Sequence, residues 1–314
     1  MEAKIPTKDP FINKDKQTPH NWQVWYRSLR PHTLTASFVP VAIGTALALQ
    51  DGEIKISLFL AMLIASMLIQ AATNMFNEYY DYKRGLDNEE SVGIGGTIVR
   101  DGIAPKTVLT VALCFFAISL LLGVYICANS SWWIAVIGIL GMITGYFYTG
   151  GPYPIAYSPF GEIVAGFFMG VIIILISYFI QTATISYNSV LISIPISILV
   201  GAILLSNNIR DLDGDKKSGR RTLAILLGRE KAILFLAGMF VVSYGWIIIL
   251  MGIEIVSPWL LLVFASLPKA IKAIRVFKAN TLPIKMMPAM VATAQTNTQF
   301  GFLVAIGLLL GYWV

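Results

Sequence analysis

The chain consists of long apolar runs separated by short polar segments. Several runs reach the roughly 20 residues that an α-helix needs to cross a bilayer. We predict about nine transmembrane helices, at residues 33–50, 56–78, 107–127, 131–148, 160–181, 188–208, 231–252, 257–275 and 293–313. Residues 1–22 are polar and are predicted to form a cytoplasmic tail, with residues 23–314 as a single transmembrane domain. The pattern therefore predicts an all-α, polytopic membrane protein.

The composition and the charge distribution support this prediction. Of the 314 residues, 56% are hydrophobic and 13% are charged, whereas about 25% of a typical soluble domain is charged. The net charge of +6 does not indicate a nucleic-acid partner, because basic residues mark the cytoplasmic loops of membrane proteins. With the amino terminus inside, 22 of the 23 Lys and Arg residues fall on the inner side, and only Lys55 falls outside. We therefore expect a cell-membrane protein whose amino terminus faces the cytoplasm.

Two helix ends carry amides and carboxylates where the chain should leave the membrane. The first has four polar residues on one helical face and a carboxylate in the following loop, namely Asn74, Asn77, Glu78, Asp81 and Asp87. In the second, three residues share one face, namely Asn208, Asp211 and Asp215. A shift of 130 residues superimposes Asn77 on Asn207 and Asp81 on Asp211, through either duplication or coincidence. Such oxygen ligands suit Mg²⁺ bound together with substrate phosphates. The alternative, a solvated loop start, explains two such motifs less well than one.

Basic and aromatic residues near these motifs indicate what kind of substrate the site could bind. The basic residues are Lys83, Arg84, Arg100, Arg210, Lys217 and Arg221. They suit a diphosphate, although positive-inside topology explains each of them equally well. A metal-bound diphosphate is a good leaving group, and an allylic cation left behind would need shielding by aromatic faces. The aromatic candidates are Tyr79, Tyr80, Tyr146, Phe147, Tyr148, Tyr153 and Tyr157, each of which could instead be a packing residue.

These motifs resemble those of the UbiA superfamily of membrane aromatic prenyltransferases. The resemblance rests on the two acidic motifs, on Arg30-Pro-His-Thr33, on Phe147-Tyr-Thr-Gly-Gly-Pro152-Tyr-Pro and on Asn207-Asn-Ile-Arg-Asp211. The last two segments are similar to the branch that prenylates 1,4-dihydroxy-2-naphthoate. Glu78 departs from the pattern, because the family usually carries Asp there. The resemblance implies nine helices around a central cavity that is capped on the cytoplasmic side and open sideways to lipid.

The resemblance also implies a reaction and residue roles. A polyprenyl group would move from polyprenyl diphosphate to 1,4-dihydroxy-2-naphthoate with loss of CO₂, as in menaquinone biosynthesis. Asp81, Asp211 and Asp215 would be catalytic. Two Mg²⁺ ions would be held by Asn77, Glu78, Asp81 and Asp87, with Asn74 as their support, and by Asn208, Asp211 and Asp215. The diphosphate would meet Arg84, Arg210, Lys217 and Arg221, and Arg30 or Tyr148 would place the acceptor.

Other functions remain open from the sequence. The acceptor could instead be 4-hydroxybenzoate, homogentisate, haem B or a lipid-linked sugar. The CDP-alcohol phosphotransferases are disfavoured because their Asp-Gly-x-x-Ala-Arg core is absent. An ion-coupled transporter is the non-enzyme alternative, and it predicts acidic residues near the middle of the membrane, whereas these cluster at one end. With only His20 and His32 present, near the chain start, a histidine metal cluster or a Ser-His-Asp triad is disfavoured.

Overall fold

The computed structural model describes residues 21–86 and 96–313. Every regular element in these ranges is helical, and they contain no strand. The elements are α1 (Asn21–Ser28), α2 (Pro31–Leu49), α3 (Ile56–Lys83), α4 (Pro105–Asn129), α5 (Trp133–Thr149), η1 (Ile155–Tyr157), α6 (Gly161–Ala165), η2 (Gly166–Ile172), α7 (Ile173–Thr182), α8 (Tyr187–Lys217), α9 (Leu223–Leu227), α10 (Arg229–Gly252), η3 (Pro258–Ser266), α11 (Leu267–Ala279) and α12 (Pro283–Trp313). The all-α prediction is confirmed.

The described helices coincide with all the predicted spans, but they do not establish the number that cross a membrane. By length and composition, five could do so, namely Ile56–Lys83, Pro105–Asn129, Gly161–Thr182, Tyr187–Lys217 and Arg229–Gly252. A sixth would be the pair Trp22–Ser28 and Thr33–Leu49, which is bent by 65°. The membrane character follows from these described helices, while the count of nine stays a prediction.

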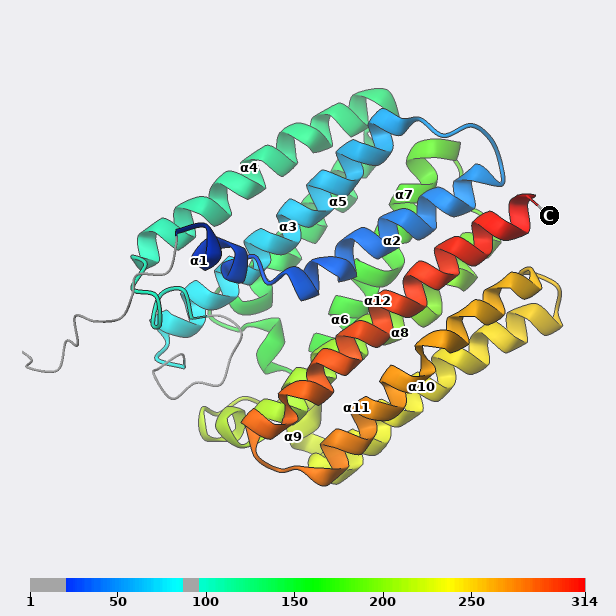
Figure 1. The fold of residues 1–314 in the computed structure, drawn as a ribbon. Coiled ribbons are helices and arrows are strands. Elements are labelled where there is room, and N and C mark those ends of the chain that lie inside the picture. The colour runs from blue at the N-terminus through cyan, green and yellow to red at the C-terminus, as the bar shows by residue number, and fades with distance from the viewer. Residues whose placement is uncertain (1–20, 87–95, 314) are drawn as a thin grey trace, which may run out of the picture.

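The helices form one bundle, in which α3, α4 and α5 lie on one side and α10 and α11 on the other (Figure 1). Helices α2, α8 and α12 lie between these groups and contact one another. Their buried faces carry much of the apolar core, including Val39, Ile43, Ile196 and Phe300. The core between these three helices is thus mainly apolar, whereas the acidic motifs lie at the helix ends.

Glycines allow some helices to approach closely, as expected where small residues line interfaces between membrane helices. A Cβ at Gly44 of α2 would lie 2.4 Å from the carbonyl oxygen of Ile174 in α7. A Cβ at Gly170 of η2 would lie 2.4 Å from the Cα of Ser197 in α8. These contacts fix α7, and η2 before it, against α2 and α8.

The predicted span at 160–181 is one helical segment with a change of winding inside it. Gly161–Ala165 and Ile173–Thr182 are α-helical, and Gly166–Ile172 between them is π-helical. A π-helix bonds each N–H to the carbonyl five residues back, and such segments occur frequently at functional sites. In this chain, Phe168, Met169 and Ile172 of the segment line a cavity of about 470 Å³, which is described below.

Candidate functional site

The two acidic helix ends meet through one arginine that the sequence analysis did not single out. Arg220 places Nη2 2.9 Å from Oδ1 of Asp81 on α3 and Nη1 3.0 Å from Oδ1 of Asp215 on α8. Its guanidinium carbon lies 4.4 Å from the centre of the Tyr157 ring. The structure therefore brings one carboxylate of each motif to the same place.

The turn after α8 explains how Arg220 reaches both carboxylates. The helix ends at Lys217, and Gly219 has φ +80°, a conformation that glycine adopts without strain. The chain then doubles back, so that the Arg220 N–H donates to the Asp215 carbonyl at 3.0 Å. The next N–H, of Arg221, donates to the Tyr157 carbonyl at 2.9 Å. These bonds fix the backbone on both sides of the Arg220 side chain.

The charge of Arg220 is stabilised by its surroundings. Burial opposes the charged form, but the Asp81 and Asp215 carboxylates outweigh that effect and raise the pKa of Arg220 above its ordinary value. The side chain is 15% exposed. Arg220 is therefore a cation at physiological pH, held between two anions.

The other residues of the first motif point elsewhere. Asn74 donates to the Leu29 carbonyl at 3.0 Å and to Thr33 Oγ1 at 2.9 Å. Asn77 accepts a hydrogen bond from Thr149 Oγ1 at 2.5 Å. Asn74 thus connects α3 to the start of α2, and Asn77 connects it to the end of α5.

Glu78 is buried against the loop that follows α3. Its Oε1 accepts from the Ile98 N–H at 2.9 Å, and its Oε2 accepts from Thr97 Oγ1 at 3.3 Å. The side chain is 1% exposed. In this structure Glu78 does not join Asp81 and Asp215, and its predicted metal contact stays a prediction, as does that of Asp87, which lies outside the described residues.

The second motif divides in a similar way. Asp211 pairs with its neighbour Arg210, at 2.7 Å from Nε and 2.5 Å from Nη2, while Nη1 of the same arginine lies 2.8 Å from the Met290 sulfur. Asn208 donates to Oε1 of Glu162 at 2.8 Å. Because a carboxylate only accepts hydrogen bonds, this contact directs the amide nitrogen of Asn208 toward Glu162, and the amide oxygen accepts no hydrogen bond from the described residues.

A cavity of about 470 Å³ begins one helical turn inside the acidic ends. Most of its wall is apolar, and its polar lining includes Arg30, Thr33, Asn77, Tyr148 and Asn207. Asn77 and Asn207 are the two asparagines that the 130-residue shift superimposes. The cavity thus offers an apolar space for a hydrocarbon chain next to a polar, charged end.

Two arginines near the acidic ends, Arg84 and Arg30, differ in their hydrogen bonding. Arg84 donates to the Thr149 and Gly151 carbonyls at 2.5 and 2.8 Å, and its guanidinium carbon lies 5.3 Å from the centre of the Tyr80 ring. Arg30 lines the cavity from a left-handed backbone position with φ 51°. The Nε of Arg30 has no hydrogen-bond partner among the described residues. Arg30 is therefore the better placed of the two to meet a ligand inside the cavity.

The remaining predicted residues lie at the surface or in packing contacts. Lys217 and Arg221 are exposed at the end of α8 and in the loop after it. Tyr80 and Tyr146 share a hydroxyl–hydroxyl hydrogen bond of 2.5 Å and pack edge to face. Tyr153 is 91% exposed, which leaves it no role in shielding a cation in this conformation.

The donor set at the acidic ends fits a hard divalent cation. Within residues 21–86 and 96–313, no group of three His, Cys, Asp or Glu side chains lies close enough to hold a metal. The oxygen groups at the two helix ends are the carboxylates of Asp81, Asp211 and Asp215 and the amides of Asn77 and Asn208, and of these Asp81 and Asp215 share the partner Arg220. Mg²⁺ prefers such oxygens and usually keeps waters and substrate phosphates in its shell.

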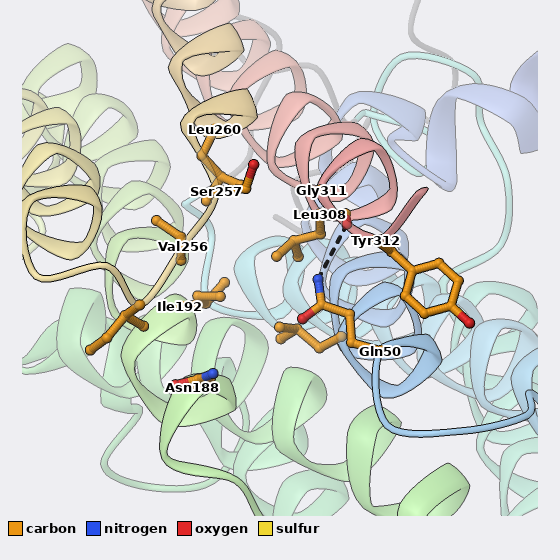
Figure 2. A pocket seen from close by; sticks show the side chains of 11 residues that line it. Gln50, Asn188, Ile192, Val256, Ser257, Leu260, Leu308, Gly311 and Tyr312 are labelled. Carbon is orange, nitrogen blue, oxygen red and sulfur yellow. Dashed lines mark hydrogen bonds between the residues drawn. The ribbon is translucent and has the colours of Figure 1, made fainter. Parts of the chain in front are cut away.

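A second cavity lies at the opposite end of the bundle, beside the carboxyl end of α12 (Figure 2). It has a volume of about 300 Å³, and no charged side chain lines it. Gln50 donates across it to the Leu308 carbonyl at 3.2 Å. The first cavity, by contrast, is lined by Arg30 and lies one helical turn from Asp81 and Asp215, so the second offers no comparable chemistry.

Sequence reasoning missed Arg220, Glu162 and Asn207. Arg220 follows the turn at Gly219, where helical spacing no longer predicts which side chain points toward the two carboxylates. The available signal for Asn207 was the 130-residue shift, which aligns it with Asn77. Glu162 carried a weaker signal, as the one carboxylate in a predicted apolar span at 160–181.

Comparisons with known proteins identify the family of the chain. A family model described as the UbiA prenyltransferase family matches residues 37–283. The chain is 58% identical to the 1,4-dihydroxy-2-naphthoate octaprenyltransferase of Bacillus subtilis, over 93% of this chain and 94% of the relative. It is 27% identical to the protein of the same name from Escherichia coli, over 93% of this chain and 96% of that one.

Solved structures share the fold at lower identity. An apo UbiA homologue from Aeropyrum pernix K1 superposes with a TM-score of 0.67 at 13% identity, over 89% of this chain and 98% of that one. A UbiA homologue from Archaeoglobus fulgidus, bound to DMAPP and Mg²⁺, superposes with a TM-score of 0.57 at 17% identity, over 90% and 99%. The resemblance inferred from the motifs is confirmed, and the chain belongs to the UbiA prenyltransferase family.

Proposed function

We propose that this protein transfers a polyprenyl group from polyprenyl diphosphate to 1,4-dihydroxy-2-naphthoate, in a Mg²⁺-dependent reaction of menaquinone biosynthesis. The observation that carries the proposal is the meeting of Asp81 and Asp215 one turn beyond a long apolar cavity. Anionic oxygen ligands beside apolar space suit a substrate with a diphosphate head and a hydrocarbon tail. The 58% identity to a naphthoate octaprenyltransferase supports this acceptor.

Asp81, Asp211 and Asp215 are the proposed catalytic residues, assisted by the amide oxygens of Asn77 and Asn208. When bound, Mg²⁺ would neutralise the negative charge that develops on the departing diphosphate. The chain's residues supply oxygen ligands for it and exclude water from the reacting carbon. Arg84, Arg210, Lys217 and Arg221 remain the proposed diphosphate contacts, with Lys217 and Arg221 at the exposed entrance.

The reaction breaks one bond in the prenyl donor and one in the acceptor, and it forms one carbon–carbon bond between them. The allylic carbon–oxygen bond breaks with its electron pair going to diphosphate, and a new carbon–carbon bond forms at the ring carbon that bears the carboxylate. The carboxylate then leaves as CO₂, and its bonding pair restores the aromatic ring. Arg30, with an unsatisfied donor in the cavity wall, is proposed to orient the acceptor carboxylate, and Tyr148 to contact the ring.

The proposed location is the cell membrane, with the acidic ends facing the cytoplasm. Basic residues concentrate in the segments predicted to be inside, which favours this orientation. A charged, water-soluble naphthoate would then reach the site from the cytoplasm. The polyprenyl chain would enter from the bilayer, alongside apolar wall residues such as Ile139 and Phe168.

The test uses purified protein in lipid nanodiscs with Mg²⁺ and a polyprenyl diphosphate. Separate reactions receive 1,4-dihydroxy-2-naphthoate, 4-hydroxybenzoate, homogentisate or haem B, and products are identified by mass. We expect a prenylated naphthol without the carboxyl mass, absent with EDTA and restored by excess Mg²⁺. Product from another acceptor alone would change the proposed substrate. Folded protein inactive with all four would overturn prenyl transfer to them and favour a lipid-linked sugar acceptor or an ion-coupled transporter.

A further inference from the structure

Arg220 is a cation that the two acidic motifs share. Its two terminal nitrogens contact one oxygen each of Asp81 and Asp215, at 2.9 and 3.0 Å. The two carboxylate side chains are only 22% and 11% exposed. Solvent therefore has limited access to either charge, and the Arg220 guanidinium is the ion-pair partner that the two carboxylates share.

The negative charges of Asp81 and Asp215 need a nearby cation for the protein to fold. Two carboxylates brought to one poorly hydrated place repel each other, and each is stabilised by a nearby cation. Removing the cation from a buried ionic cluster leaves uncompensated charge, which is strongly destabilising. Arg220 thus allows α3 and α8 to bring their acidic ends together before any ligand arrives.

The same contacts conflict with metal binding. A divalent cation at this site would bind the same two carboxylates, whose Oδ1 atoms Arg220 now holds. The bound cation and the guanidinium would both be positive and would lie against the same carboxylates, so they would repel each other. The repulsion is stronger where water is scarce. Binding of a divalent cation to both carboxylates is therefore expected to push the guanidinium away from at least one of them.

We propose that Arg220 is a place-holding cation, a positioning residue that pairs Asp81 with Asp215 in the empty enzyme and gives up these carboxylates when the divalent cation binds. The inference rests on the proposed function, which supplies the metal and an anionic substrate to receive the released guanidinium. It assigns one side chain to two successive partners.

Three features of the loop suit this exchange. Gly219, with φ +80°, precedes Arg220 and permits backbone conformations closed to other residues. The Tyr157 ring, 4.4 Å from the guanidinium carbon, offers a contact that does not depend on the carboxylates. The Nε–H of Arg220 is buried and has no hydrogen-bond partner among the described residues. An arriving diphosphate oxygen would satisfy that donor.

The test measures metal binding without any prenyl diphosphate. Wild-type protein, Arg220→Gln, Arg220→Lys and the control Lys216→Gln are purified in the same detergent. The control removes one positive charge from an exposed position on the last turn of α8. The dissociation constant for Mn²⁺ is measured by electron paramagnetic resonance and that for Mg²⁺ by competition. The thermal unfolding midpoint is recorded with and without metal.

We expect Arg220→Gln to bind metal between about 10- and 30-fold more tightly than wild type at low ionic strength. The upper value is the effect of one unit charge on a divalent ion about 4 Å away in water. Arg220→Gln should also unfold at a lower temperature without metal and gain more from metal than wild type. Lysine cannot span both carboxylates as a fork, so Arg220→Lys should fall between the two. Lys216→Gln should change affinity less than about threefold.

Unchanged or weaker metal affinity in folded Arg220→Gln would overturn the proposal, and it would assign the arginine a purely structural role. If that variant does not fold, Arg220→Lys decides, and affinity equal to wild type overturns it. The proposed function is judged separately, by prenyl transfer in the wild type. Turnover without the affinity gain removes only the place-holding role, whereas the affinity gain without turnover keeps that role and removes the proposed substrates.

Discussion

The buried carboxylate of Glu78 lends itself to a sharp prediction, because the sequence and the structure give it different tasks. The family resemblance predicts a metal ligand at this position, whereas the structure shows hydrogen bonds to Ile98 and Thr97. We expect Glu78→Ala to destabilise the protein and to leave its affinity for Mg²⁺ nearly unchanged. Glu78→Gln serves as the matched control, because it keeps the side-chain length and one acceptor oxygen.

The magnitude follows from the contacts that are lost. Truncation leaves the Ile98 N–H buried without a partner, which costs about 2 kcal/mol. It also removes one buried methylene, which adds about 0.8 kcal/mol. We therefore expect Glu78→Ala to lower the free energy of unfolding by about 3 kcal/mol. Glu78→Gln should lose less than half of that amount, because the Ile98 N–H keeps its acceptor.

The assay has two parts. The free energy of unfolding is measured by titration with a denaturing detergent in mixed micelles, followed by circular dichroism. The Mg²⁺ concentration for half-maximal prenyl transfer is measured on the folded fraction of each variant. Suppose Glu78→Ala stays within about 1 kcal/mol of wild type while its Mg²⁺ requirement rises about tenfold. That pair of results would refute the structural role and support the metal contact predicted from the sequence.

Three further substitutions test the site and the bundle. Asp211→Asn should lower kcat at least about 100-fold, whereas Asp213→Asn, at an exposed position on the same helix, should retain wild-type turnover. Equal losses of turnover in the two variants would remove the proposed catalytic role of Asp211. Glu162→Gln should weaken Mg²⁺ binding about 10- to 100-fold, because the amide that it orients becomes free to turn; unchanged affinity would contradict this. Gly170→Ala should cost about 1–3 kcal/mol of stability, because its Cβ would lie 2.4 Å from the facing backbone. Gly238→Ala, with open space around it, should cost nothing, and equal costs would refute the packing argument.

The sequence predicted the fold well because hydrophobic run length is a local property. The described helices coincide with the predicted spans, and α8 extends far enough to carry Asp211 and Asp215 on a helical face. Local patterns do not reveal a change of winding such as η2, which depends on how α6 and α7 pack against α2 and α8. The number of membrane crossings also depends on a bilayer that lies outside the chain.

The candidate site was predicted less completely, because turns and tertiary contacts decide where side chains point. Helical spacing correctly put Asp81 and Asp215 at the ends of two helices. It could not choose between Arg220 and Arg221, since that choice follows from the backbone at Gly219. Nor could it foresee that Glu78 would face the loop, because its partners in that loop lie 19 and 20 residues further on.

The π-helical winding of Gly166–Ile172 amounts to an inserted residue in a transmembrane helix. Deleting one residue there would restore regular α-helix and rotate α6 by about 100° relative to α7. Glu162 would then turn away from Asn208, or Ile174 would turn out of its contact with Gly44 of α2. The insertion therefore lets α6 and α7 keep different helical registers, so that α6 faces Asn208 while α7 packs against α2. Length changes should be tolerated least at this point of the chain.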